Sequence, residues 1–370
     1  MKTKKQKHRI LVVTGTLRIG GLENVAVNCM RYANRDNLHF TFLVLSGTKG
    51  ELENDVKAMG GEVIHTKLYT NPVKYVTSLC KIMKANGPFD IVHSHVFFNS
   101  GLILLAAKMA GIEIRIAHSH SIRRNGISLS KNIFNNIMRL LLQACATKVC
   151  ACSRAAGEYV FGKRYYAHHG VLVPNIIDIE RYRFNAEARN CKRKEFGLSD
   201  DEQLIGQVGN LVPAKNQLFL LNVFCHYIKK HKAKLVIVGE GVMRHAIENT
   251  IKELHLENSV ILTGSRKDIP DVLSAMDVFV CTSTNEGLGI VLLEAQANGL
   301  PCICEEHAIV DEIKELGNCS FVSGFSYEEK WCEVISSLVH QRNNLERIIH
   351  LQESSFSIKN FVDVINRLYQ

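Results

Sequence analysis

The chain has 370 residues, of which 46% are hydrophobic and 22% charged, a globular balance that predicts two domains with real cores. No apolar run is long enough to cross a bilayer, which argues against a membrane-spanning helix. The net charge of +9 fits nucleic acid, an anionic membrane surface or phosphorylated small substrates as partners, and does not choose among them.

The cysteines indicate a reducing compartment. There are twelve, and many lie inside apolar runs, as Cys150 and Cys302 do. The lysine-rich start is followed by only a short apolar run, residues 10–13, which does not fit a signal peptide. We therefore expect a cytoplasmic protein with buried thiols.

Strands and helices alternate along the first half. Short apolar runs predict strands at residues 9–14, 40–45, 62–65, 91–94, 114–118 and 148–151. Helical patterns lie between them, for instance at 72–86 and 102–110. This alternation predicts an α/β fold with a doubly wound parallel sheet, in which ligands bind at the carboxyl ends of the strands.

The second half repeats this architecture. A polar, basic stretch at 178–195 is interpreted as the linker and entry to a second domain. Strands are then predicted at 203–208, 234–238, 260–263, 278–281, 301–304 and 320–322. The end of the chain, 357–370, is a helix with Phe361, Val362, Ile365 and Leu368 as its apolar stripe. We predict domains at 1–175 and 186–350, facing a cleft, and a C-terminal segment at 351–370.

The segment from Glu286 to Glu294 is the strongest candidate for a binding site. A buried strand leads into a turn with Gly287 and Gly289, and a helix begins after it. A helix N-terminus offers free N–H groups and a positive dipole end, which suits a phosphate. The flanking carboxylates repel phosphate, so their expected partners are hydroxyls of a ribose or hexose. The pattern indicates a sugar nucleotide; the alternative is an ordinary βα unit with solvated glutamates.

A second candidate is Lys215, which lies between a predicted strand and a helix N-terminus. A lysine there is unfavourable unless an anion lies beside it, so we expect a phosphate contact rather than a solvated lysine. Gly20 and Gly21 precede the first helix, and they either let backbone approach a phosphate or acceptor or form a simple turn. Neither the dinucleotide-binding motif nor the Walker motif is present.

Four histidines form two His-Ser-His pairs, His93/His95 and His118/His120, each at a predicted strand end. Strand alternation places both members of a pair on one face. No carboxylate or thiolate stands at matching spacing, so we expect no metal site. A histidine contact with a bound substrate is the preferred interpretation, and one or two of the four are expected to be structural.

Residues 128–143 form an amphipathic helical pattern, preceded by Arg123 and Arg124. Its apolar face comprises Ile133, Phe134, Ile137, Met138 and Leu141, opposite Lys131, Asn132, Asn135 and Arg139. Two interpretations remain open: a helix that faces the core, or an interfacial helix that meets anionic lipid.

These residues together resemble the retaining glycosyltransferases of family 4 (group 1), whose GT-B fold has two Rossmann-like domains facing a cleft. The spacing of Glu286 and Glu294 matches the family's E-x7-E signature. The resemblance covers nearly the whole chain and points to capsular and exopolysaccharide enzymes, through residues 115–120, Gln217 and residues 293–297. It implies an acceptor-binding first domain, a nucleotide-sugar-binding second domain and a last helix that packs back on the first.

The resemblance also implies roles. Glu294 would hold the ribose hydroxyls and Glu286 the hydroxyls of the donor sugar. Lys215 would neutralise the leaving diphosphate, and His118 or His120, with His118 preferred, would lie by the reacting centre from the opposite domain. The backbone against the diphosphate would come from Gly287, Leu288, Gly289 and Ile290.

Two positions depart from the family pattern. Asn210 stands where the family usually has an arginine that makes a second phosphate contact, and its loss would weaken stabilisation of the leaving group. We expect Arg266 or Arg18 to compensate, or the enzyme to be slow. Ile176 stands where the family commonly has glycine, which affects the geometry of the hinge and not the chemistry.

We therefore expect a retaining hexosyltransferase that uses a nucleoside diphosphate sugar, with UDP as the default base. The expected acceptor is a lipid-linked oligosaccharide or growing polysaccharide in capsule or exopolysaccharide biosynthesis. We expect no required cofactor, no metal and no nucleic-acid partner, with peripheral contact at the cytoplasmic face of the inner membrane. The alternatives are a nucleotide-sugar epimerase of the same architecture and a non-catalytic protein that binds sugar nucleotides or nucleic acid.

Overall fold

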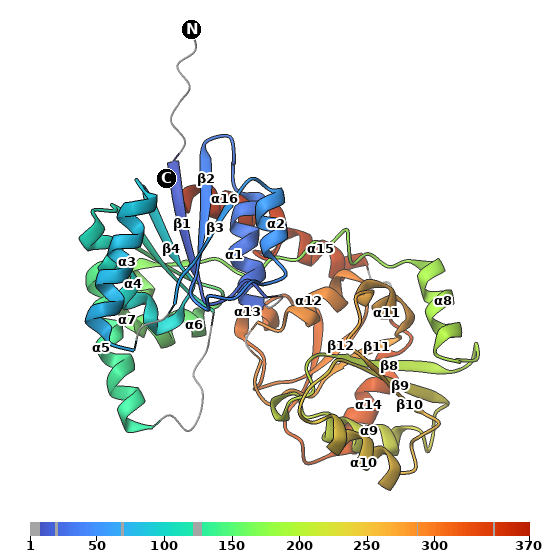
Figure 1. Ribbon diagram of the computed structural model, residues 1–370. Helices are drawn as coiled ribbons and strands as arrows, with labels where there is room; N and C mark the ends of the chain where they lie inside the picture. Colours follow the sequence, from blue (N-terminus) through green and yellow to red (C-terminus); the bar gives the residue numbers. More distant parts are fainter. Residues whose placement is uncertain (1–7, 19–20, 68–69, 121–127, 287, 343–344) are drawn as a thin grey trace. The chain divides into compact units, whose positions relative to one another are not determined.

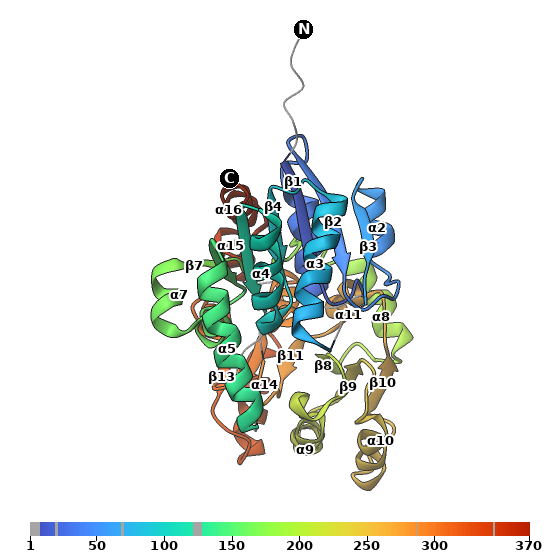
Figure 2. The same ribbon diagram turned by 60° about the vertical axis from the view of Figure 1, so that its left-hand side comes forward.

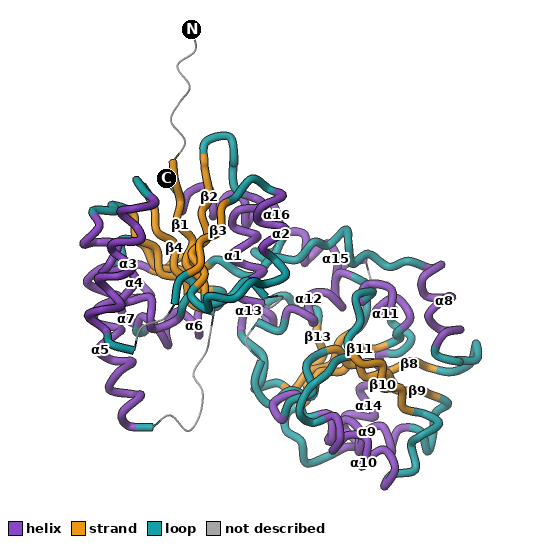
Figure 3. Tube along the Cα trace, in the orientation of Figure 1, coloured by secondary structure: helices purple, strands orange, loops and turns teal. Residues whose placement is uncertain are grey.

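A computed structural model describes residues 8–18, 21–67, 70–120, 128–286, 288–342 and 345–370. The chain divides into two compact units (Figure 1). Unit 1 comprises Met1–Ile176 and Ile358–Gln370, and unit 2 comprises Ile177–Ser357. Each unit has its own parallel sheet with helices on both faces, so the predicted fold class is confirmed (Figure 3).

Unit 1 is built on a seven-stranded parallel sheet with the order β3-β2-β1-β4-β5-β6-β7. Its strands are β1 (His8–Thr14), β2 (Leu38–Val44), β3 (Glu62–His65), β4 (Ile91–Ser94), β5 (Ile114–Ser119), β6 (Lys148–Ala151) and β7 (Gly170–Leu172). Its helices are α1 (Gly21–Tyr32), α2 (Glu53–Ala58), α3 (Pro72–Asn86), the 3-10 helix η1 (Phe97–Asn99), α4 (Ser100–Ala110), α5 (Leu129–Cys145), α6 (Arg154–Phe161), α7 (Lys163–His169) and α16 (Ile358–Leu368). The short β7 was not predicted.

Alternate residues of each strand in unit 1 enter different cores. Leu11 and Val13 pack with α3, α4 and α5, whereas Ile10 and Val12 pack with α1 and α16. Figure 1 shows these two groups of helices on opposite faces of the sheet. Because both faces are covered, the strands are nearly continuous apolar runs, and for that reason the sequence predicted them well.

The last helix, α16, covers the same face as α1. Phe361, Ile365 and Leu368 are buried in that core, and each such burial stabilises the fold by about 1.5–3 kcal/mol. Tyr369, just beyond the helix, is also buried and stacks edge-on against Phe40. The end of the chain thus completes unit 1.

Unit 2 has a six-stranded parallel sheet with the order β10-β9-β8-β11-β12-β13. Its strands are β8 (Gln203–Val208), β9 (Ala233–Val238), β10 (Val260–Gly264), β11 (Val278–Cys281), β12 (Cys302–Glu305) and β13 (Cys319–Val322). Its helices are α8 (Ala186–Glu195), the 3-10 helix η2 (Pro213–Lys215), α9 (Gln217–Tyr227), α10 (Arg244–Glu253), α11 (Ile269–Ala275), α12 (Ile290–Ala297), α13 (Asp311–Lys314), α14 (Glu328–Leu338) and α15 (Leu345–Glu353).

Part of the stretch interpreted as a linker is a helix. Asn185 caps α8 by accepting hydrogen bonds from the backbone of Glu187 and Ala188. Arg189 then pairs with Asp277, with 2.5 Å between Nη2 and Oδ1. This helix has no buried residue and therefore no apolar stripe, so its polar sequence resembled a linker.

The prediction for α5 was wrong about its faces. Ile133, Phe134 and Ile137 are exposed, whereas Asn135 is buried. The start of α4 packs on the middle of α5, where Gly101 lies against Met138, and the N-terminal half of α5 extends beyond α4 (Figure 2). Among the residues of unit 1 that the structure describes, the apolar side chains of that half therefore have no core to enter.

Two further predictions concern membranes and thiols. In the ranges that the structure describes, no helix is long and apolar enough to cross a bilayer. All twelve cysteines have free thiols. Cys150 and Cys302 are buried, as predicted from their apolar surroundings.

Candidate functional site

The order of strands in unit 2 determines where its ligand site lies. The chain runs from β8 outward to β10 and then returns to β11 on the other side of β8. At such a topological switch point the loops after the two central strands diverge, and ligands bind between them. These are the loops that carry Lys215 and Glu286. The fold thus brings together two predicted residues that lie far apart in sequence.

Lys215 and Glu286 form an ion pair through Lys215 Nζ and Glu286 Oε1. Ser283 Oγ donates a hydrogen bond to the same carboxylate oxygen at 2.6 Å. The Glu286 side chain is 9% exposed and that of Lys215 21% exposed. Charges this far from water are tolerated because they are paired. The site therefore holds one cation, Lys215, and one anion, Glu286. A ligand with a negative charge can take the place of Glu286 beside Lys215, and a hydroxyl can take the place of Lys215 beside Glu286.

Hydrogen bonds to backbone carbonyls join the two loops and fix Lys215. Thr282 Oγ1 donates to the Lys215 carbonyl at 3.1 Å, and Gln207 Nε2 donates to the same oxygen at 3.2 Å. The amide of Thr284 donates to the Ala214 carbonyl at 2.8 Å. Sequence reasoning missed Gln207 and Thr282, although both lie at the carboxyl ends of the central strands, where supporting residues are expected.

Glu294 lies on α12, which begins after the predicted glycine turn. Gly289 has φ +64°, a left-handed conformation that disfavours other residues. Tyr182 Oη donates a hydrogen bond to Glu294 Oε1 at 2.7 Å. Burial raises the pKa of Glu294, and the Tyr182 hydrogen bond opposes that shift. Tyr182 was missed because it lies in the stretch interpreted as a linker.

Of the loop residues predicted to lie against the diphosphate, the structure describes Leu288, Gly289 and Ile290. The side chain of Leu288 is buried in the core beneath α12, so its backbone is anchored there. Ile290 is the first residue of α12. Gly287 lies outside the described residues.

Two residues predicted to contact phosphate behave differently from Lys215. Arg266 is engaged by carboxylates, with 2.6 Å to Asp268 and 2.7 Å to Glu195. The structure thus shows Arg266 in a carboxylate network. The side chain of Asn210 is exposed, and its carbonyl accepts a hydrogen bond from Gln217 Nε2 at 3.2 Å.

In unit 1 the two His-Ser-His pairs gather on one face of the sheet. The strand positions of Ile91 and Ile116 in the α1/α16 core place all four histidines on that side. The ring centroids of His118 and His120 are 4.1 Å apart, those of His93 and His95 4.2 Å, and those of His95 and His118 4.9 Å. The prediction that each pair shares a face is confirmed. Because β4 and β5 are neighbours in the sheet, the two pairs form one histidine cluster, which comprises His93, His95, His118 and His120.

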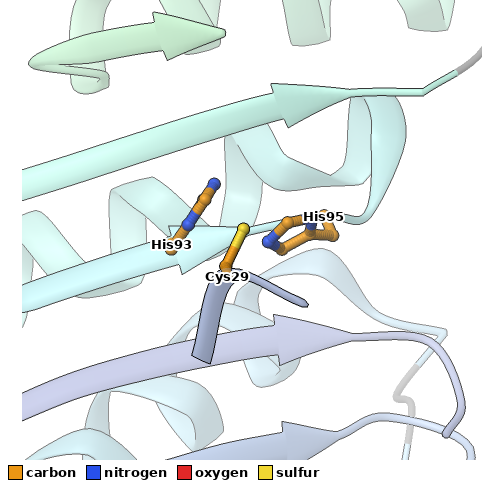
Figure 4. A group of neighbouring side chains, drawn as sticks. All are labelled: Cys29, His93 and His95. Atoms are coloured by element: carbon orange, nitrogen blue, oxygen red, sulfur yellow. The ribbon is translucent and has the colours of Figure 1, made fainter. Parts of the chain in front are cut away.

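Thiols and a phenol from other elements border this histidine cluster. His93 Nδ1 lies 2.8 Å from Tyr369 Oη, and His93 Nε2 lies 3.9 Å from Cys150 Sγ. Cys29, from α1, places its sulfur between the rings of His93 and His95 (Figure 4). The sequence argument against a metal relied on the lack of a nearby thiol, and the fold supplies two.

The histidine cluster is buried and electrically neutral. Burial, followed by repulsion from neighbouring imidazoles, lowers the pKa of His93, His95 and His118 well below the usual range. Burial lowers the pKa of His120 to about 3. Three sets of ligand atoms lie close enough to hold a metal: Cys29/His93/His95, His93/His118/Cys150 and His95/His118/His120.

The structure describes only some of the other candidates in unit 1. Gly21 begins α1, and Arg18 is exposed. Gly20, Arg123 and Arg124 lie outside the described residues.

Family models match both halves of the chain. Residues 19–181 match the family described as Glycosyltransferase Family 4. Residues 188–352 match the family described as Glycosyl transferases group 1.

Individual relatives agree with these matches. The putative glycosyltransferase EpsF of Bacillus subtilis is 31% identical over 333 residues, which cover 89% of this chain and 87% of EpsF. The capsular polysaccharide biosynthesis glycosyltransferase CapH of Staphylococcus aureus is 23% identical, with 91% and 92% covered. A UDP-Gal:alpha-D-GlcNAc-diphosphoundecaprenol alpha-1,3-galactosyltransferase of Escherichia coli is 29% identical, with 62% and 61% covered.

Among solved structures, Anabaena HepE in complex with UDP superposes with a TM-score of 0.81 at 18% identity. The superposition covers 98% of this chain and 99% of HepE. The fold is therefore shared from end to end. Together with the family matches and the identity to EpsF, it shows that the chain belongs to the family 4 (group 1) glycosyltransferases of the GT-B fold and is a transferase.

Proposed function

We propose that the protein transfers a hexose from a UDP-sugar to a hydroxyl of a lipid-linked or growing polysaccharide, with retention at the anomeric carbon. The observation that carries the proposal is the pairing of Lys215 with Glu286 at the switch point of unit 2, with Glu294 following on α12. Support for the donor and acceptor classes comes from relatives, since one is named for UDP-Gal and a diphosphoundecaprenol acceptor and another for capsular polysaccharide.

In this proposal, transfer depends on stabilising the departing diphosphate. Lys215 supplies the cation once the donor draws it from Glu286, and Glu286 is then free to accept hydrogen bonds from sugar hydroxyls. Glu294, held by Tyr182, accepts from the ribose hydroxyls. The backbone from Leu288 to Ile290 is proposed to lie against the diphosphate.

No residue needs to act as a general acid, because a diphosphate is already a good leaving group, in contrast to the alcohols that glycosidases must protonate. A phosphate oxygen of the donor takes the acceptor proton. Lys215 provides the charge that a metal would otherwise supply, so we propose transfer without an added divalent cation. A histidine of unit 1, His118 or His120, is proposed to contact the donor sugar at the reacting centre.

The missing arginine at position 210 remains part of the proposal. Arg266 is already paired with Asp268 and Glu195, so Arg18 is the remaining candidate for a second phosphate contact. Without such a contact, Lys215 acts alone and turnover is slow.

We further propose that α5 meets the membrane that carries the acceptor. Leu129, Ile133, Ile137 and Leu140 are each more than half exposed on this helix. Basic residues border them: Lys131 on α5 and, beginning α7, Lys163 and Arg164, all exposed. Arg139 of α5 donates a hydrogen bond to the carbonyl of Val160, shortly before α7, at 3.1 Å. An apolar strip beside cations fits a bilayer with anionic headgroups.

Vesicle sedimentation tests this contact. Wild type should pellet with phosphatidylglycerol vesicles and less with phosphatidylcholine vesicles, and Ile133→Glu/Ile137→Glu should remain in the supernatant. Val242→Glu is the matched control, because Val242 is 83% exposed but lies in unit 2. Equal pelleting of all three proteins would rule out α5 as the contact.

A donor screen tests the function. Purified protein is incubated with UDP-, GDP- and ADP-sugars, with and without membrane lipid extract, and products are followed by mass spectrometry. Transfer predicts consumption of one donor only when extract is present. Conversion of a donor without extract would instead indicate an epimerase, and no conversion in either case would indicate a binding protein.

A further inference from the structure

The four-histidine cluster of unit 1 contains more ligand atoms than sugar transfer uses. At most one of these imidazoles is proposed to contact the donor, and His93 is already held by Tyr369. The other three, His95, His118 and His120, lie at the carboxyl ends of β4 and β5. Their ligand atoms are all within 4.8 Å of one another.

These three rings contain ring nitrogens with no hydrogen bond of normal geometry. His95 Nδ1 and His120 Nε2 lie 2.9 Å apart. Across the parts of the chain that the structure describes, His95 Nε2, His120 Nδ1 and both nitrogens of His118 are buried without such a bond. Native proteins rarely leave buried polar atoms in this state unless a water or ion satisfies them. These ring nitrogens are therefore candidates to bind a ligand.

The chemistry of the donor set favours a cation as the ligand. The three donor atoms are imidazole nitrogens, which bind a metal ion through a lone pair, and this set needs neither a carboxylate nor a thiolate. Neutral imidazole is a preferred ligand of zinc, and three histidines with an open fourth position form a known type of zinc site.

The geometry requires little adjustment. Two nitrogens on a tetrahedral zinc are about 3.3 Å apart, so the widest separation must close by at most about 1.5 Å, within the reach of side-chain rotation. The backbone is fixed meanwhile, since the amide of His95 donates to the Val13 carbonyl at 2.9 Å and Ser119 Oγ donates to the Ala156 carbonyl at 3.0 Å.

The neighbouring sets of ligand atoms are less suited. Both include His93, whose Nδ1 is engaged by Tyr369 Oη at 2.8 Å. Both also need a cysteine thiol, and that of Cys150 already donates a hydrogen bond to the Ala117 carbonyl at 3.6 Å. We infer that His95, His118 and His120 form a binding site for a divalent transition metal, with Zn²⁺ as the preferred ion.

This inference does not rest on the proposed function. Sugar transfer is proposed to rely on Lys215, not on a metal, and the zinc site lies in unit 1. Because His118 or His120 is also proposed to contact the donor sugar, zinc and donor sugar are expected to compete for that imidazole. Bound Zn²⁺ should therefore slow transfer, not support it.

Metal binding is measured directly on the full chain. Protein freed of metal with a chelator is titrated with Zn²⁺, and the bound metal is counted by mass spectrometry while melting is followed. We expect one ion per chain and a rise in Tm of about 5–10 °C at a hundredfold excess over Kd. His95→Asn and His120→Asn should each lose most of the rise. His168→Asn, the same change at an exposed histidine of α7, should keep it.

Further variants keep the outcomes distinct. Glu294→Ala should lose stabilisation by UDP and keep stabilisation by Zn²⁺, so failure of the donor site and of the zinc site are separable. If His95→Asn does not fold, His120→Asn, the less buried of the two, decides. No uptake by wild type, or equal uptake by His120→Asn and His168→Asn, would overturn the site.

Cobalt identifies the ligands. Co²⁺ bound by imidazoles should show tetrahedral visible bands without a thiolate charge-transfer band, and Cys29→Ser should leave the spectrum unchanged. A charge-transfer band that disappears in Cys29→Ser would place the metal at Cys29, His93 and His95 instead, and would contradict the proposal.

Discussion

Both units place functional residues at the carboxyl ends of strands near the middle of a sheet, but these residues differ in charge. In unit 2, Lys215 and Glu286 follow the two central strands and offset each other's charge in a nearly buried pair. In unit 1, the histidine cluster also lies at the ends of central strands, but its rings are neutral and several nitrogens are unpaired. The ion pair of unit 2 suits a charged ligand, which can replace one member of the pair as the partner of the other. The histidine cluster of unit 1 suits a hydroxyl or a cation, which can interact with the unpaired ring nitrogens.

The contrast has an energetic basis. Removing one member of a buried ion pair costs about 3–5 kcal/mol, because the other charge remains without compensation. Protonating a buried neutral histidine is unfavourable in a similar way, because it creates a charge where none is solvated. Unit 2 should therefore be sensitive to mutation of its charges, and unit 1 to pH.

Acid should destabilise unit 1 most strongly. The pKa of His120 is lowered from 6.5 to about 3, and the other three shift in the same direction. A histidine whose pKa is lowered by folding makes its full contribution to the free energy of unfolding above pH 6.5. That contribution is lost as the pH falls from 6.5 toward the pKa of the histidine in the folded protein. Each histidine lowers the free energy of unfolding by about 1.4 kcal/mol per pH unit within that window.

Urea unfolding at several pH values measures this loss. Far-UV circular dichroism reports both units, whereas the only tryptophan, Trp331, lies in unit 2. The circular-dichroism transition should move to lower urea before the Trp331 fluorescence transition does. His118→Leu should reduce the pH slope and His168→Leu should not. Parallel movement of both signals would argue against the histidine cluster as the cause.

Replacing the lysine of the ion pair should have the next largest effect. Lys215→Ala should lower transfer about 100- to 1000-fold, because the leaving diphosphate loses its cation. It should also lower the free energy of unfolding by about 3 kcal/mol, since Glu286 remains buried and unpaired. Lys215→Ala/Glu286→Ala should recover stability without activity. Recovery of transfer in the double variant would show that stability alone was lost.

Donor affinity should depend on Glu294 to a smaller degree. Glu294→Gln should weaken UDP binding about 10- to 100-fold, as expected for loss of a charged hydrogen-bond acceptor. Burial raises the pKa of Glu294, so wild-type affinity should fall as pH drops through that raised value, whereas Glu294→Gln should show no such dependence. Calorimetric titration with UDP across pH measures both. A wild-type affinity independent of pH would contradict the role of the carboxylate.

The smallest effect concerns the residue that orients Glu294. Tyr182→Phe removes the 2.7 Å hydrogen bond and should weaken UDP binding about 3- to 10-fold. Because this hydrogen bond lowers the pKa of Glu294, its loss should move the pH dependence of binding upward. Tyr227→Phe, which removes a 2.7 Å bond to Gln203 elsewhere in unit 2, is the control.

The sequence predicted the fold better than the surroundings of the sites. The strands at 91–94, 148–151 and 278–281 agree with the structure residue for residue, because buried parallel strands are local apolar runs. For α5, the pattern defined two faces, but the extent of α4 decided which residues would meet a core. Periodicity alone does not contain that information.

The same distinction applies to the sites. Lys215, Glu286 and the histidine pairs were predictable because strand ends in a doubly wound sheet converge. Cys29, Cys150 and Tyr369 were not, since they reach the histidine cluster from a helix, another strand and the end of the chain. Arg266 pairs with Glu195 and Asp268, and the sequence pattern did not predict these two contacts.

The central claim, that unit 2 holds the nucleotide-sugar donor for transfer, is tested most directly with a radiolabelled UDP-hexose. Transfer into lipid-extractable product is compared for wild type, Glu294→Ala and Glu257→Ala, the last changing an exposed glutamate of the same unit. We predict label in lipid with wild type and Glu257→Ala, and loss of nearly all transfer with Glu294→Ala at limiting donor. Equal transfer by all three proteins would contradict the assignment of the donor site.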